Sequence, residues 1–299
     1  MKYSNNHLKA KVSISNFYIV FIILFVFHTS HYLYAQEKYD INYDILLKEI
    51  KNESVDVISI QNSIQQFNNI DKAARINLTE RLVSDAFDLK KYSLAYDLRL
   101  FSIQIGKSDC LILEDQLGQY LRKNNIEKYR KLENEYYLHY NNYLDQYSPN
   151  VNREICFVLH RMVRLDQRTK FEANNNQDST KNDFLWDLVR VQDSLNEILF
   201  GQIIEEFGYP GKSLVGFADM SIGYILMLHM STKFQMKYVY LLKKAYDEKE
   251  LYSNIPFLID KILYKCCRKS IYGNWVGEGL AQLETDPKAI ELLLKQLKL

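Results

Sequence analysis

Five polar residues in the second half of the chain have side chains that can hold or transfer protons. They comprise three carboxylates, one amide and one imidazole, and each falls within or beside an apolar helical pattern: Asp166, Asp193, Asn196, His229 and Asp260. Histidine is the most frequent general base in enzymes, and a carboxylate that accepts its ring N–H can orient it. The set therefore indicates either a proton-transfer site or a buried network that serves the fold alone.

Asp166 lies in the middle of an apolar face. On a wheel of about 100° per residue, the helix predicted over residues 151–168 places Asp166 near Leu159 and Met162. An unpaired buried carboxylate is strongly destabilising, so Asp166 must be paired, hydrogen-bonded or protonated. The alternative is that the helix unwinds before it reaches Asp166.

The next helix, predicted over residues 183–207, carries a second polar pair. Asn196 falls within its apolar arc and Asp193 at the edge of that arc. We expect the arc to face the core; its members are Phe184, Leu188, Val191, Leu195, Leu199 and Ile203. The Asn/Gln-rich stretch 169–182, which precedes this helix, is expected to be an exposed insertion.

His229 ends a helix of about residues 218–230 that is apolar on nearly all sides, as buried helices are. A turn rich in glycine, from Gly208 to Gly216, comes just before it. One interpretation is a structural histidine bonded to a backbone carbonyl. The other is a buried network with Asp166 and Asn196, because buried polar groups need partners. We expect that network.

The remaining patterns predict an all-α fold. A helical-hairpin layer is expected first, with helices at about 41–51, 55–67, 70–88, 91–105, 110–122 and 126–147. Lys91–Ala95 and Asn125–Tyr129 are similar segments 34 residues apart, which is the tetratricopeptide period, so we interpret the layer as repeat-like. A compact helical domain follows, with helices at about 232–247, 254–268 and 286–298 and a short extended piece near 270–276.

Tyrosines form a stripe along the predicted helix 126–147. They recur at steps of three and four with one leucine among them: Tyr129, Leu132, Tyr136, Tyr140, Tyr143 and Tyr147. The pattern favours a packing face with hydroxyls at its rim. The alternative is an aromatic groove for a sugar or a peptide.

Residues 1–35 have the pattern of a secretory signal peptide. Three lysines precede an apolar run from Phe17 to Phe27, and Leu33-Tyr34-Ala35 is an acceptable cleavage site. We expect cleavage near Ala35 and a periplasmic or secreted protein; the alternative is an inner-membrane signal anchor. The domains are then residues 1–35, 36–148 and 149–299.

Composition limits the partners. The chain has 299 residues and a formal net charge of +1, which does not indicate a nucleic-acid partner. Its four cysteines, Cys110, Cys156, Cys266 and Cys267, form neither a spaced disulfide framework nor a zinc pattern, although one disulfide could form. No dinucleotide fingerprint, P-loop or HExxH motif occurs. We therefore predict no cofactor and no metal.

The order of several short motifs resembles an uncharacterised bacterial family, domain of unknown function 6624, over about residues 150–276. The matching segments are Asp166-Gln167-Arg168, Asp193 with Asn196, Gly208-Tyr209-Pro210, Val215-Gly216, His229, Phe234-Gln235, Asp260-Lys261 and Tyr272-Gly273. Here Tyr209 replaces the family's tryptophan and Lys261 its arginine. Leu228 and Ser231 replace a glutamine and an aspartate around the histidine, and Ser270 and Asn274-Trp275 differ also. The resemblance implies a shared site but no established activity.

Two functions follow from these observations. The first is an interaction module of the cell envelope, whose helical layer binds a protein or peptide. The alternative is an envelope hydrolase or transferase with catalytic residues His229, Asp166, Asp193 and Asp260. The candidate binding residues are Asn196, Arg168, Tyr209, Gln235 and Tyr272.

Overall fold

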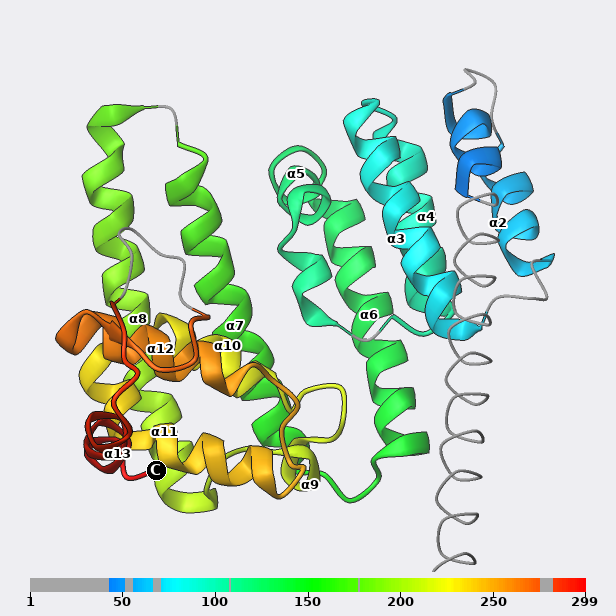
Figure 1. The fold of residues 1–299 in the computed structure, drawn as a ribbon. Helices are drawn as coiled ribbons and strands as arrows, with labels where there is room; N and C mark the ends of the chain where they lie inside the picture. The colour runs from blue at the N-terminus through cyan, green and yellow to red at the C-terminus, as the bar shows by residue number, and fades with distance from the viewer. Residues whose placement is uncertain (1–42, 52–55, 67–70, 108, 177, 275–281) are drawn as a thin grey trace, which may run out of the picture. The chain divides into compact units, whose positions relative to one another are not determined.

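The fold is all-α, as predicted (Figure 1). The computed structural model describes residues 43–51, 56–66, 71–107, 109–176, 178–274 and 282–299. The predicted signal peptide lies outside these residues. None of the described helices is both long enough and apolar enough to cross a membrane.

The described chain divides into two compact units, Met1–Lys107 and Ser108–Leu299. The sequence had placed the division near residue 148. The difference has a physical reason: buried Glu114, at the end of the helical turn 110–113, accepts hydrogen bonds from Arg164 and Arg168, so residues 109–147 pack with the second unit.

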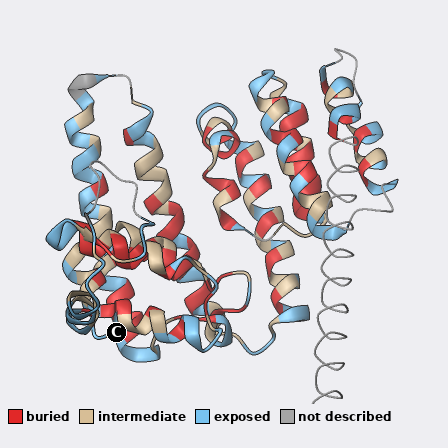
Figure 2. Ribbon diagram, in the orientation of Figure 1, coloured by how far each residue is buried: buried red, intermediate tan, exposed pale blue. Residues whose placement is uncertain are grey.

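The first unit is a layer of helices. Residues 43–51 are helical, followed by α2 (Val57–Gln66), α3 (Lys72–Asp88) and α4 (Tyr92–Gln104). Asp71 caps α3 by accepting the amide of Ala74, and Lys90, with φ of 60°, turns the chain into α4. The helices α3 and α4 pack along each other as the expected hairpin. Most of their buried residues are apolar, and Figure 2 shows buried segments along both helices.

The second unit begins with η1 (Cys110–Leu113), α5 (Gln116–Asn124) and α6 (Ile126–Tyr147). The predicted tyrosine stripe on α6 is a packing face: Tyr129, Tyr136 and Tyr140 are each at most 5% exposed. Tyr136 and Tyr140 stack with their ring centroids 5.9 Å apart. The stripe is therefore part of the core from Tyr129 to Tyr140, whereas Tyr143 is half-buried and Tyr147 is exposed.

A long hairpin of α7 (Arg153–Asn174) and α8 (Ser179–Phe207) runs through the rest of the unit (Figure 1). The stretch 169–182, expected to be an exposed insertion, is helical over most of its length, because α7 continues to Asn174 and α8 begins at Ser179; its exposure is confirmed at Glu172, Asn174, Asn175, Asp178 and Lys181. Ala173 is buried there, and Lys170 is fixed by carboxylates of both helices. Asp166 accordingly stays within a regular helix.

The remaining elements pack near one end of this hairpin: α9 (Lys212–Val215), α10 (Ile222–His229), α11 (Thr232–Asp247), α12 (Ile255–Cys267) and α13 (Pro287–Gln296). The extended piece expected near 270–276 is short. It contains β1 (Lys269–Ser270), which pairs in parallel with β2 (Gln282–Leu283), and residues 275–276 lie outside the described part of the chain.

The predicted inward arc of α8 was wrong. Phe184, Leu188, Val191, Leu195 and Leu199 are exposed, and of that arc only Ile203 is buried. The helix instead packs through a face that contains Val189, Asn196, Phe200, Ile203 and Ile204. Because α8 is apolar on two sides, its sequence pattern did not reveal which side faces the core.

Candidate functional site

Three elements bring the predicted histidine and carboxylates together. Asp166 lies in α7 and Asp193 in α8, and His229 is the last residue of α10, which packs against both helices. The Nδ1 atom of His229 lies 2.8 Å from Oδ2 of Asp166. The predicted partnership of Asp166 and His229 is thus present.

Asp166 is fully buried and has further partners. The Nε2 amide of Gln167 donates to Oδ2 over 2.7 Å, and the Lys170 ammonium donates to Oδ1. Lys170 also donates to Oδ1 of Asp193 over 2.7 Å. Lys170 therefore links the two carboxylates, which makes Asp166 the centre of a charged cluster.

The electrostatics of the cluster keep Asp166 ionised. Burial alone would raise the pKa of this carboxyl, but hydrogen bonds and charge from His229 and Lys170 outweigh burial and lower it. The pKa of Asp193 is raised, first by burial and also by the negative charge of Asp166. The pKa values of the two linked carboxylates are therefore shifted in opposite directions.

His229 is the open side of the cluster. Its side chain is 29% exposed, whereas that of Asp166 is 0% exposed. No described residue hydrogen-bonds its Nε2 atom, and that atom is not among the buried unpartnered ones. Since Nδ1 faces Asp166, the arrangement leaves Nε2 directed to solvent as a possible proton acceptor.

Lys261 adds positive charge beside this histidine. It donates from Nζ to the backbone carbonyl of Leu228, the residue before His229. Burial, followed by the nearby charges of Lys265 and Lys170, lowers the pKa of Lys261 to about 8, despite an opposing effect of Asp193. Lys261 therefore has a pKa much closer to neutral pH than an ordinary lysine.

Asp260 is engaged elsewhere. Its Oδ1 accepts the amides of Ile271 and Tyr272 over 2.8 and 3.0 Å, and its Oδ2 accepts the amide of Asn274 over 2.8 Å. These bonds hold the segment that follows α12, and none of the hydrogen bonds described for Asp260 joins it to the cluster. The structure thus gives the third expected catalytic carboxylate a role in loop geometry.

Asn196 is buried but separate from the pair. Its Oδ1 accepts a hydrogen bond of 2.9 Å from Gln192, and no described residue accepts one from its Nδ2. No hydrogen bond described here connects it to Asp166 or His229. Two members of the expected three-residue network are therefore joined, and the third is not.

The other candidate binding residues stabilise the fold. Arg168 forms hydrogen bonds of 3.0 and 2.7 Å with the carboxylate of Glu114. Tyr209 donates to the carbonyl of Met220 over 2.9 Å, and Gln235 donates to that of Met227 over 2.8 Å. Tyr272 is 45% exposed, and its backbone amide donates to Asp260.

Two features of the site escaped the sequence analysis. Lys170 lay in the stretch expected to be an exposed insertion. The other is a second histidine–carboxylate pair, in which Nε2 of His160 lies 2.9 Å from Oδ1 of Asp219 and the Tyr140 hydroxyl donates to Oδ2. Asp219 is the one charged residue in the stretch 218–228, and that exception was the available signal.

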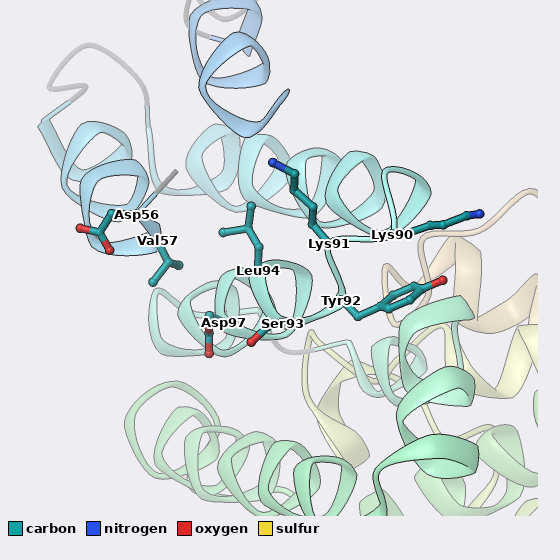
Figure 3. A pocket seen from close by; sticks show the side chains of 8 residues that line it. All are labelled: Asp56, Val57, Lys90, Lys91, Tyr92, Ser93, Leu94 and Asp97. Atoms are coloured by element: carbon teal, nitrogen blue, oxygen red, sulfur yellow. The ribbon is translucent and has the colours of Figure 1, made fainter. Parts of the chain in front are cut away.

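A pocket of about 600 Å³ lies in the first unit (Figure 3). Asp56 and Val57 line it from the start of α2, and the rest of its lining comes from the α3–α4 turn and α4. Those residues are Lys90, Lys91, Tyr92, Ser93, Leu94 and Asp97. The pocket is thus lined by charges of both signs together with apolar groups.

Among the described residues, no group of three or more His, Cys, Asp or Glu side chains is arranged to hold a metal ion. All four cysteines are unpaired thiols. Comparison with protein-family models matched no family, and comparisons with curated proteins and with solved structures gave no match either.

Proposed function

We propose that Asp166 and His229 form a general-base dyad for hydrolysis or group transfer on a cell-envelope substrate. The observation that carries this proposal is that the two nitrogens of the His229 ring have different surroundings. Nδ1 is held 2.8 Å from a buried carboxylate, while Nε2 has no described protein partner. A base whose tautomer and orientation are fixed in this way can accept a proton from water or a substrate hydroxyl.

In this proposal His229 is the catalytic base and Asp166 its positioning residue. As Nε2 takes a proton, the ring becomes positively charged, and the Asp166 anion at Nδ1 stabilises that charge. Lys170 keeps Asp166 ionised and also bonds Asp193. Lys261 supplies a nearby cation, which favours a substrate that is anionic or that develops negative charge during reaction.

The proposed compartment follows from the predicted signal peptide in residues 1–35. We also propose, from motif order alone, that residues 150–276 belong with domain family 6624. In that case two residues of the Asp–Gln–Arg motif have different roles. Asp166 and His229 form the dyad, and Arg168 anchors α7 to Glu114.

The dyad is tested with chromogenic esters, amides and phosphate esters, using protein recovered after export. We expect hydrolysis of at least one class, with a loss of about 100-fold or more in His229→Ala, the usual range for a general base. His139→Ala is the matched control, because His139 is a half-buried histidine on α6 and has no part in the cluster. Equal rates for the three proteins would contradict the proposal.

A second readout separates positioning from folding. Asp166→Asn should lower the rate constant and shift the pH–rate profile, because the amide can no longer stabilise the imidazolium. A merely structural Asp166 would lower the amount of folded protein and leave the profile of the remaining activity unchanged.

The pocket of the first unit supports a second candidate, the interaction module. Its mixed charges and apolar lining suit an extended peptide that carries both charged and apolar side chains. Binding can be measured with a peptide array and then by calorimetry. We expect Ser93→Arg, which fills the pocket, to abolish binding, and His229→Ala to leave it intact; the opposite result would assign binding to the second unit.

A further inference from the structure

The exposed face of α8 has a regular apolar pattern. Its residues recur at steps of four, three, four and three, and we call them the α8 seam: Phe184, Leu188, Val191, Leu195 and Ile198. Each is at least 41% exposed, and Phe184 and Ile198 reach 62% and 60%. Isolated exposed leucines are ordinary, but a continuous row on one helix face marks an interaction surface.

The seam is distinct from the face through which α8 packs in its own unit. The packing face contains Val189, Phe200 and Ile203, which are at most 7% exposed. At about 100° per residue, the seam lies on the other side of the helix. Burial within the unit therefore does not account for its apolar residues.

Alternating steps of three and four give a mean spacing of 3.5 residues, the repeat with which one helix packs along another in a coiled coil. The seam thus predicts a helical partner. We propose that the partner is α8 of a second copy of this chain, paired antiparallel and centred between Val191 and Leu195.

The seam is self-complementary in that orientation. Val191 would lie opposite Leu195 of the second copy, and Leu188 opposite its Ile198. A two-fold axis repeats each contact, as an isologous interface requires. Every central layer of the pair then contains two apolar side chains.

Charge at the two ends favours the antiparallel orientation. The same register places Lys181 opposite Glu205 of the second copy. These side chains are 72% and 64% exposed, and each also has an exposed partner within its own chain, Asp178 and Lys237 respectively. A parallel pair would instead place Lys181 opposite Lys181 and Glu205 opposite Glu205. Like charges across an interface disfavour such an arrangement.

The area is sufficient for a specific dimer of moderate affinity. Five large side chains, each about half exposed, together with the adjoining Leu199, offer roughly 500 Å² per chain. A pair would bury roughly 1,000 Å², which is at the small end of the range for specific interfaces. We therefore expect dissociation in the micromolar range.

The first test is sedimentation equilibrium of the protein recovered after export, across the micromolar range. We expect a reversible dimer, and at least tenfold weaker association in Leu188→Lys and in Ile198→Glu. Leu138→Lys is the matched control, since Leu138 on α6 is 56% exposed and lies outside the seam. A monomer at all concentrations, or a dimer insensitive to both seam changes, would overturn the proposal.

The second test fixes the orientation. In an antiparallel pair, the double variant Leu188→Lys with Ile198→Glu places opposite charges across the seam twice, so dimerisation should recover at least in part. In a parallel pair it places like charges across the seam, so association should stay as weak as in the single variants. Failure of the double variant to recover would exclude the antiparallel register.

Other occupants of the seam give different results. If the first unit of the same chain covers the seam, the protein is a monomer, and a cysteine introduced by Val191→Cys reacts slowly with a thiol reagent. If a lipid surface covers it, the protein is a monomer that binds vesicles of phosphatidylethanolamine and phosphatidylglycerol, and Leu188→Lys weakens that binding. Either result would replace the second copy as the partner.

Discussion

The second unit contains two histidine–aspartate pairs that differ in solvent access. His160 and Asp219 are at most 1% exposed, with Tyr140 as a further hydrogen-bond donor to the carboxylate. His229 pairs with a buried Asp166, but its own side chain is 29% exposed. The same two side-chain types therefore form a closed pair and an open pair within one helical core.

The ring nitrogens differ as well. In the closed pair the carboxylate meets Nε2 of His160, and Nδ1 is buried without a partner among the described residues. In the open pair the carboxylate meets Nδ1 of His229. Only the open pair leaves a nitrogen that water or a substrate can reach. Geometry, and not the presence of a histidine beside an aspartate, therefore distinguishes a candidate site from a structural contact.

The largest expected effect is in the closed pair. Asp219→Ala removes the partner of buried His160 and of the Tyr140 hydroxyl, so we expect a loss of about 3–5 kcal/mol in the free energy of unfolding. Urea unfolding followed by tryptophan fluorescence reports on the second unit, because both tryptophans lie after residue 108. Asp145→Ala is the control: its partner Arg153 is exposed, so the change should be below about 1 kcal/mol.

Substitutions in the open pair should lower the free energy of unfolding by less than Asp219→Ala does. We expect Asp166→Ala to lower the free energy of unfolding by about 2–4 kcal/mol, since it leaves buried polar groups unpaired, and His229→Ala to lower it less because the ring can be solvated. A double-mutant cycle should give a coupling of about 1 kcal/mol or more. Additive effects would show that the two residues do not interact in solution.

The comparison also shows what the sequence could reveal. The predicted bounds 126–147 agree with those of α6, because Asn125 caps the helix and tyrosines mark its buried face. Asp166 could be found because one carboxylate in an apolar arc needs a partner. Its contact with His229 follows from the same rule, since a histidine at the end of an apolar helix has the same need.

Other features depended on information that a helical wheel does not contain. Lys170 follows polar residues and precedes an Asn/Gln-rich stretch, so only the length of α7 shows that it reaches Asp166 and Asp193. The inward face of α8 was not predictable because both of its faces are apolar. Asp260 has a carboxylate of the kind that catalytic sites use, yet its two oxygens accept hydrogen bonds from three backbone amides.

Lys261, which lies beside the open pair, should make the free energy of unfolding depend on pH. Its pKa is lowered to about 8, below the usual lysine value near 10.4. Between these values the unfolded chain binds more protons than the folded chain, so this residue makes stability rise with pH. Lys261→Met should remove that rise and stabilise the protein at pH 7, by less than Asp166→Ala destabilises it.

The measurement is the difference in urea midpoint between Lys261→Met and the unchanged protein from about pH 7 to pH 10. Comparing the two proteins cancels the tyrosines that titrate near the upper end of the range. Lys131→Met on α6 is the control, because Lys131 is exposed and is not among the charges that shift the pKa of Lys261. A difference that does not vary with pH would mean that Lys261 is hydrated in solution.

The smallest expected effect concerns Asn196, which the sequence placed in the same network as the open pair. Its Nδ2 is buried without a described acceptor, so replacing it removes a group that lost water and gained no hydrogen bond. Asn196→Leu also removes the acceptor of Gln192, which is only half-buried and can bond water instead. We expect stability to change by less than about 1 kcal/mol.

The decisive measurement for Asn196 is the Asp166–His229 double-mutant cycle repeated in the Asn196→Leu protein. An unchanged coupling energy between Asp166 and His229 would show that Asn196 does not interact with the pair. If that coupling energy falls by half or more, Asn196 belongs to a three-residue network with them, and its Nδ2 group interacts with the pair in solution.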